Sequence, residues 1–139
     1  MTRWDVVIIG AGPAGLFCAA SIAPRQKILV LEKNARPGKK LLISGSGRCN
    51  ITHDGPVDSF FPHYGGAGRF LNQAMHAFTN QDLARYFAER GLPLADNGKG
   101  KLFPRSERAR DVLEILLGEV KNNGAVLRQG HGAERIGRD

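Results

Sequence analysis

The sequence has 139 residues, of which 42% are hydrophobic and 24% charged, and it carries a formal net charge of +7. This length and composition fit one globular domain. The longest apolar runs, residues 6–9 and 115–117, are far too short to cross a bilayer, and the N-terminus lacks the features of a signal peptide. We therefore expect a cytoplasmic protein with no membrane partner. Two cysteines are too few for a disulfide framework, and the four histidines show no metal-ligand spacing.

The positive charge is concentrated in two stretches. Residues 33–53 contain five basic side chains and no acid, and residues 99–110 contain five against Glu107 alone. Ordinary solubility explains the net charge equally well. The clustering, however, suits a partner that bears phosphate, either a nucleotide cofactor or a nucleic-acid backbone.

A βαβ unit is predicted over residues 1–33. Residues 5–9 form a continuous β-branched run, as in a parallel strand that is buried on both faces. A glycine-rich turn follows, then a helical pattern over residues 16–23 and a second strand over residues 27–32. Crossovers of this kind are right-handed.

A helical segment is predicted over residues 66–123. Residues 69–78 place Phe70, Met75 and other apolar side chains on one face, and Thr79 to Asp82 form a variant capping box that begins another helix. Residues 98–104 are predicted to form a basic loop before a last helix, and residues 124–129 a third strand. The expected fold class is a Rossmann-like α/β domain whose parallel strands lie in the order 3-2-1, with an inserted helical segment.

The glycine turn carries the first functional motif. Gly10, Gly12 and Gly15 match the Gly-x-Gly-x-x-Gly pattern between a strand and a helix. Gly10 would allow a sharp turn, Gly12 would let a pyrophosphate approach the backbone, and Gly15 would let the helix pack closely on the strand. Pro13 and Ala14 open that helix, whose N-terminal N–H groups attract phosphate. The turn therefore predicts a dinucleotide site; the alternative is a glycine-rich turn without a ligand.

An acid at the end of the second strand supports this prediction. Glu32 lies 22 residues after Gly10, close to where a carboxylate binds ribose hydroxyls and repels a 2′-phosphate. Lys33 adds a positive charge beside it. Together these residues favour FAD and NAD equally.

Residues 38–53, GKKLLISGSGRCNITH, carry the second motif. Gly45 and Gly47 remove side chains where a flat ring or a diphosphate could press on the backbone, and Ser44 and Ser46 offer hydroxyls. Positive charge comes from Lys39, Lys40 and Arg48; each exposed charge contributes roughly 1 kcal/mol or less. We expect this segment to hold the far half of an extended dinucleotide.

Three stretches together resemble the BaiN-like, or aminoacetone-oxidase-like, bacterial flavoproteins: VVIIGAGPAGL, LLISGSGRCNITH and GKLFPRSERARDVLEILL. The resemblance implies a three-domain FAD-dependent oxidoreductase, with NAD(P)H as a possible reductant. It also implies that the segment matching Ser44–Asn50 runs along the flavin, and that the segment containing Phe103 belongs to the nucleotide-binding part. The residues expected to bind cofactor are Gly10, Gly12, Pro13, Ala14, Gly15, Glu32, Lys33, Lys40, Ser44, Gly45, Gly47, Arg48, Cys49, Asn50 and Phe103.

Members of this family are several times longer than the sequence. The resemblance therefore implies an N-terminal fragment that lacks a substrate domain and is inactive by itself, although the full-length parent is an enzyme. The substrate is an unidentified small molecule. We expect no nucleic-acid partner, and self-association of the fragment through an exposed sheet edge.

Cys49 is the weak catalytic candidate. One interpretation is a redox or substrate-facing thiol beside the flavin ring, and the other is a small residue that packs against the cofactor. Because no second cysteine is near in sequence, the packing interpretation is favoured.

Two other functions remain open from the sequence. A tRNA-modifying type of flavoprotein would share the glycine turn and the basic charge. An NAD-only or non-catalytic dinucleotide-binding module would share the turn and Glu32.

Overall fold

The computed structural model describes residues 3–23 and 25–137. The chain divides into two compact units: residues 1–43 together with 113–139 form the first, and residues 44–112 form the second. In the part of the chain that the structure describes, no helix is both long and apolar enough to span a membrane.

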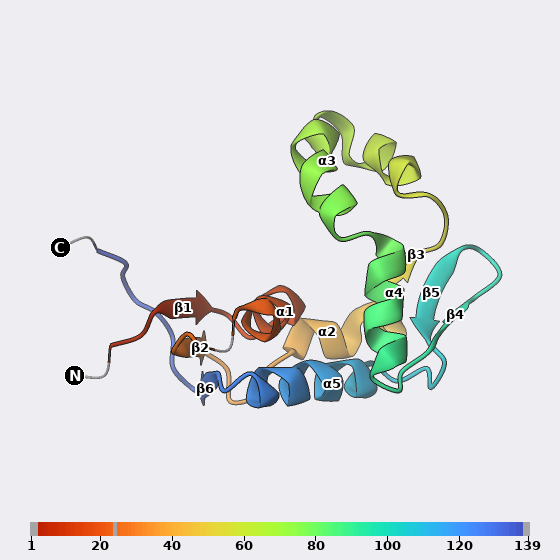
Figure 1. The fold of residues 1–139 in the computed structure, drawn as a ribbon. Helices are drawn as coiled ribbons and strands as arrows, with labels where there is room; N and C mark the ends of the chain where they lie inside the picture. Colours follow the sequence, from red (N-terminus) through yellow and green to blue (C-terminus); the bar gives the residue numbers. More distant parts are fainter. Residues whose placement is uncertain (1–2, 24, 138–139) are drawn as a thin grey trace. The chain divides into compact units, whose positions relative to one another are not determined.

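The first unit is built on a parallel three-stranded sheet (Figure 1). Its strands are β1 (Val6–Ile9), β2 (Ile28–Glu32) and β6 (Val126–Gln129), with β2 in the middle. Val6 lies opposite Ile28, and Leu29 lies opposite Val126. In chain order these are the first, second and third strands of the unit, so the predicted 3-2-1 order is confirmed.

The helix α1 (Pro13–Ser21) packs against β1 and β2. Leu16 and Ala19 of α1, and Ile28 and Val30 of β2, are completely buried. Burying one large aliphatic side chain of this kind contributes roughly 1.5–3 kcal/mol. These contacts hold the glycine turn, which lies between β1 and α1, on a rigid base.

Burial of β1 differs from the prediction. Its residues alternate, and Val7 and Ile9 are 50% and 54% exposed. The continuous apolar run predicted burial on both faces, which is wrong for the described residues. The reason is position: β1 is an edge strand of this sheet, and its burial depends on what packs beside it rather than on its own sequence.

A long-range contact fixes the end of α1. The side-chain amide of Asn123, which follows α5 (Ala109–Asn122), donates to the carbonyl oxygens of Ala19 and Ile22 at 2.8 and 2.7 Å. The last carbonyls of a helix have no partner inside the helix, so these bonds satisfy acceptors that would otherwise be orphaned. The turn after α5 continues through Gly124 at a φ of +72°.

The second unit contains an antiparallel sheet that the sequence did not predict. Its strands are β3 (Thr52–His53), β4 (Leu94–Asp96) and β5 (Lys101–Pro104), in the order β3-β5-β4. Residues 98–104 are therefore not simply a loop, and the helical segment predicted over 66–123 is interrupted by two strands. The hairpin turn is stabilised by Asp96, whose carboxylate accepts hydrogen bonds from the N–H groups of Gly98 and Gly100 at 3.0 and 2.8 Å.

Three further helices of the second unit are η2 (Val57–Ala67), α3 (Gly68–Ala77) and α4 (Asn80–Glu89). The predicted capping box is confirmed: Thr79 caps α4, and the Asp82 side chain accepts from the Thr79 backbone N–H at 2.9 Å. The apolar face predicted for residues 69–78 is only partly buried. Phe70 is 86% exposed, because no described residue covers its ring, although α3 as a whole packs against η2.

Residues 38–53, the segment expected to hold the far half of the dinucleotide, contain regular structure. They contain the short helix α2 (Lys39–Ile43), the 3-10 turn η1 (Ser44–Gly47) and β3. The boundary between the two units falls between α2 and η1. The predicted cofactor residues therefore form two groups, one in each unit.

Candidate functional site

The glycine turn has the backbone that the motif predicts. Gly10 adopts a φ of +99°, a conformation that favours glycine, and its N–H donates to the carbonyl of Leu31 at 2.7 Å. Gly12 is the N-cap of α1, in an extended conformation and without a capping side-chain hydrogen bond, and Pro13 stands in the first turn. Free N–H groups and the positive end of the helix dipole at this terminus favour an anion.

Gly12 and Gly15 serve different purposes. A Cβ atom at Gly15 would overlap the carbonyl oxygen of Gly10 and come within 3.3 Å of the Ile8 side chain. A Cβ atom at Gly12 would have no described heavy atom within 4 Å beyond its chain neighbours. Gly15 is thus required for packing inside the protein. Packing gives no reason for a glycine at position 12, which leaves the backbone open to a ligand.

Glu32 is 7% exposed and holds the turn in place. Its Oε2 accepts from the backbone N–H of Ala11 at 2.8 Å, and its Oε1 accepts from the backbone and side-chain N–H groups of Asn34 at 2.8 and 2.6 Å. The Asn34 backbone, then the Ala11 backbone, lower the pKa of Glu32 below its ordinary value, against the opposing effect of burial. A carboxylate has about four acceptor sites, and the described residues occupy three of those of Glu32.

Gly12 and Glu32 line one cavity of about 370 Å³ in the first unit. The full lining is Gly12, Glu32, Asn34, Gly38, Lys39, Lys40 and Ile43. The structure thus brings together three residues of the predicted set, Gly12, Glu32 and Lys40. Lys33 is exposed and does not line the cavity.

Gly38 was missed by the sequence analysis. It adopts a φ of +70°, and a Cβ atom there would come within 2.6 Å of the Leu113 side chain. Its N–H donates to the carbonyl of Ala11 at 2.9 Å. Gly38 therefore brings the start of α2, with Lys39 and Lys40, up to the glycine turn. The signal available in the sequence was a glycine directly before two lysines.

The second group of predicted residues lies in the second unit and has unusual backbone conformations. Gly45, Ser46 and Gly47 have φ values of +54°, +58° and +83°, and Cys49 has +62°. Left-handed conformations cost roughly 1–2 kcal/mol per non-glycine residue, and such strain is concentrated at functional sites. The Ser-Gly-Ser-Gly order therefore encodes a left-handed turn, in which two of three positions carry no such cost.

Phe103 supports this turn from β5. A Cβ atom at Gly45 would lie 3.0 Å from the Phe103 ring and 2.8 Å from the N–H nitrogen of Asn50. The guanidinium of Arg48 lies 4.8 Å from the centre of the same ring, and it also pairs with Glu107 at 3.4 Å. Phe103 is 7% exposed. It is a packing residue beneath the turn, and Arg48 is half-exposed above it.

Cys49 is buried, and burial raises the pKa of its thiol, against a smaller effect of a hydrogen bond with Ser44. A thiolate is the reactive form of cysteine, so both features oppose a redox role. Among the described residues, no group of three histidine, cysteine or acidic side chains is arranged to hold a metal ion.

Comparison with known proteins identifies the family. The family model described as the HI0933-like protein Rossmann domain matches residues 4–139. The chain belongs to this family. The family match, with the bile acid reductase described next, confirms the resemblance inferred from the three sequence stretches.

Two curated relatives match the HI0933-like domain over most of its length. A ribosomal RNA dihydrouridine synthase of Escherichia coli is 32% identical over 92% of the chain, which spans 32% of that relative. A 3-dehydro-bile acid delta(4,6)-reductase of Clostridium scindens is 30% identical over 93% of the chain and 32% of that relative. The chain thus spans about a third of the length of these proteins.

Solved structures confirm the Rossmann-like fold. The structure of Thermovibrio ammonificans THI4 superposes on 94% of the chain, which spans 40% of that protein, with a TM-score of 0.62 and 16% identity. At this identity the similarity shows the α/β fold.

Proposed function

We propose that the chain is the FAD-binding portion of an FAD-dependent oxidoreductase. The observation that carries the proposal is the joint arrangement of Gly12, Glu32 and Lys40 in one cavity at the N-terminus of α1. The open space at Gly12 fits a pyrophosphate, because a Cβ there would meet no protein atom but would occupy the ligand's place.

Each group has a distinct part in holding the ADP half. The N–H groups at the start of α1 bind pyrophosphate oxygens, and Lys40 adds charge near them. The remaining acceptor site of Glu32 receives one ribose hydroxyl. A carboxylate at this position disfavours a ribose 2′-phosphate, which argues against NADP in this cavity.

The strained Ser44–Cys49 turn and its support by Phe103 are proposed, from the family resemblance, to serve the flavin half. Bound FAD supplies the hydride-transfer chemistry. The reductant is proposed to be NAD(P)H and the protein cytoplasmic.

The proposal is tested by purifying the full-length protein and identifying any bound flavin by its visible absorbance and by chromatography after denaturation. FAD at near one equivalent supports the assignment. Protein without flavin that also fails to bind added FAD would contradict it.

A second candidate function is reduction of a pyrimidine in ribosomal RNA, with FAD as the cofactor. The relative from E. coli is named for this activity, and the net charge of +7 suits a nucleic-acid substrate. This candidate departs from the expectations of a small-molecule substrate and of no nucleic-acid partner. Mass spectrometry of ribosomal RNA from the native host, with and without the gene, tests it: loss of a dihydrouridine on deletion supports it, and an unchanged RNA contradicts it.

A further inference from the structure

A second cavity lies within residues 44–112 and is separate from the predicted cofactor residues. Its volume is about 460 Å³, and it is lined by His53, Asp54, Ser59, Phe60, His63 and Tyr64. Four of the six are aromatic or imidazole rings. Cavities with several rings and a few polar groups suit a planar ligand, because stacking supplies affinity and the polar groups set orientation.

One wall of this cavity is the ring of His53, which is contacted by several neighbouring groups. The His53 ring nitrogens lie 2.7 Å from the carbonyl oxygen of Asp54 and 3.1 Å from that of Lys99. Gly100 allows this position, because a Cβ there would overlap the His53 ring. Phe60 meets the same ring edge-on, with centroids 6.4 Å apart. A wall that is ordered before binding reduces the entropy cost of binding a ring.

Two polar groups of the cavity, Ser59 and Asp54, present hydrogen-bond acceptors. The Ser59 hydroxyl already donates to the carbonyl of Pro56 at 2.7 Å, so its oxygen is left to accept. The Asp54 carboxylate accepts hydrogen bonds and donates none. Acceptors favour a ring with an N–H group on its edge, as uracil has.

Positive charge lies next to this cavity. Lys101 is directly opposite His53 in the β3–β5 pairing, so the two side chains lie on the same face of the sheet. Lys101 and Lys99 are both exposed. The neighbouring acid Asp58 is in contact with His76, at 3.1 Å. The arrangement places a ring site beside cations suited to phosphate.

We propose that this cavity binds a base of single-stranded RNA, of the uracil type, with an adjacent phosphate at Lys101. The ring stacks among Tyr64, Phe60 and His53, and its N–H edge meets Asp54. The inference rests on the second candidate function and names the part of the chain that receives the RNA. A free nucleotide cofactor offers the same chemistry, and the test below separates the two.

The experiment measures binding of a fluorescein-labelled oligouridylate to the full-length protein, saturated with FAD, by fluorescence anisotropy. Tyr64→Ala should weaken binding at least about fivefold, as is typical for loss of one stacked base. Tyr64→Phe should restore it, since the ring is kept. The matched control is Phe70→Ala, which removes an aromatic ring that is 86% exposed on α3 and outside the cavity, and should change affinity less than about twofold.

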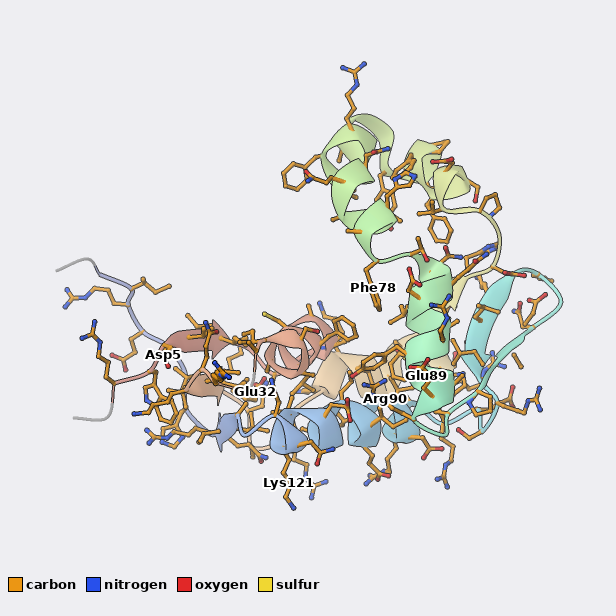
Figure 2. All side chains as sticks on the ribbon, in the orientation of Figure 1. Asp5, Glu32, Phe78, Glu89, Arg90 and Lys121 are labelled. Atoms are coloured by element: carbon orange, nitrogen blue, oxygen red, sulfur yellow. The ribbon has the colours of Figure 1, made fainter. Side chains whose placement is uncertain are left out.

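The salt dependence provides a second measurement. Lys101→Ala should reduce the slope of log affinity against log salt by roughly 0.7, the value expected for one phosphate of a single strand. Lys121→Ala, an exposed lysine on α5 (Figure 2), should leave the slope unchanged.

Three results would overturn the proposal: no oligouridylate binding by the wild type, equal losses in Tyr64→Ala and Phe70→Ala, or displacement of the oligonucleotide by free FAD added beyond the amount that saturates the protein. The last would assign the cavity to the cofactor. Dihydrouridine formation is measured in parallel. If the protein reduces RNA but does not bind it in this cavity, only the assignment of the cavity as the RNA site is rejected. If it binds RNA in this cavity but does not reduce it, only the RNA reductase function is rejected.

Discussion

The Glu32 carboxylate at the end of β2 accepts a hydrogen bond of 2.8 Å from the backbone N–H of Ala11 in the glycine turn. The two residues are 21 positions apart, and the bond joins the two strand ends on which the proposed ADP site is built. Glu32 is therefore a positioning residue for the turn as well as a proposed ligand of ribose.

Glu32→Gln should destabilise the protein by about 1–3 kcal/mol at neutral pH, because an amide cannot accept at both of its polar atoms and leaves a buried N–H group without a partner. The folded-state pKa is lowered, so the unfolded chain takes up the proton first as pH falls. The stability that ionised Glu32 contributes is complete above the ordinary glutamate pKa, and it is lost as pH falls through the lowered pKa of the folded state. Urea unfolding at several pH values measures it.

The matched control is Glu114→Gln, which changes an exposed glutamate on α5. The stability gap between wild type and Glu32→Gln should narrow toward acid pH, whereas the control should show little gap at any pH. A gap that stays constant from neutral to acid pH would show that the lowered pKa contributes nothing.

Gly12→Val should abolish FAD binding and leave stability nearly unchanged. Its side chain enters space that no described protein atom occupies but that the pyrophosphate requires. Flavin stoichiometry and circular dichroism measure the two effects. Gly118→Val is the control, since a Cβ at this α5 glycine also meets open space, and valine is slightly better than glycine in a helix.

Gly15→Val should behave differently from Gly12→Val. It should cost stability rather than only affinity, because the Gly10 carbonyl and Ile8 occupy the space it needs. Wild-type flavin content in Gly12→Val would count against the whole cofactor assignment.

The glycine turn and the capping box could be predicted from sequence because each depends on residues a few positions apart. The small sheet of β3, β4 and β5 could not. Its strands have two to four residues, and the Asp96–Gly100 turn between two of them is a typical loop composition. The hydrogen bonds of Asn123 to Ala19 and Ile22 join residues about a hundred positions apart, and no local sequence pattern predicts them.

The candidate site could be predicted only where it depends on the spacing of residues along the sequence. Gly12 and Glu32 follow a spacing rule, and the structure places both in one cavity. Gly38 was missed because the need for glycine there comes from the Leu113 side chain, which is far away in the sequence and leaves no room for a Cβ atom. Phe103 packs against Gly45 and Arg48, and its expected place at the cofactor stays a prediction.

Cys49→Ser should keep FAD and most of the flavin reduction by NAD(P)H, because the thiol is buried and has its pKa raised. Arg48→Ala should lower FAD retention and flavin reduction more than Cys49→Ser does. It removes the cation above Phe103 and the pair with Glu107, and with them the support of the strained turn. Stopped-flow absorbance of the flavin compares the two full-length variants. If Cys49→Ser loses reduction while Arg48→Ala retains it, the assignment of Cys49 to packing is wrong.

The 139-residue chain by itself should self-associate through β1. In the described sheet β1 is an edge strand, its run contains neither lysine nor proline, and Val7 and Ile9 are about half exposed. Such an edge offers unpaired backbone groups to a second chain. The same chain should bind FAD weakly, because the cavity lined by Gly12, Glu32 and Lys40 accounts only for the ADP half of the cofactor. Light scattering and a flavin titration on one sample measure both properties.

Two substitutions separate association through the β1 edge from non-specific hydrophobic association. Val7→Lys places a charge on β1 and should shift the chain toward the monomer, as lysines do on natural edge strands. Ile136→Lys also replaces an exposed aliphatic residue, 81% exposed and outside the sheet, and should leave association unchanged. If both variants dissociate equally, association is non-specific. A wild-type chain that stays monomeric at high concentration and binds FAD tightly would show that β1 does not recruit a partner and that the first unit holds the cofactor without further contacts.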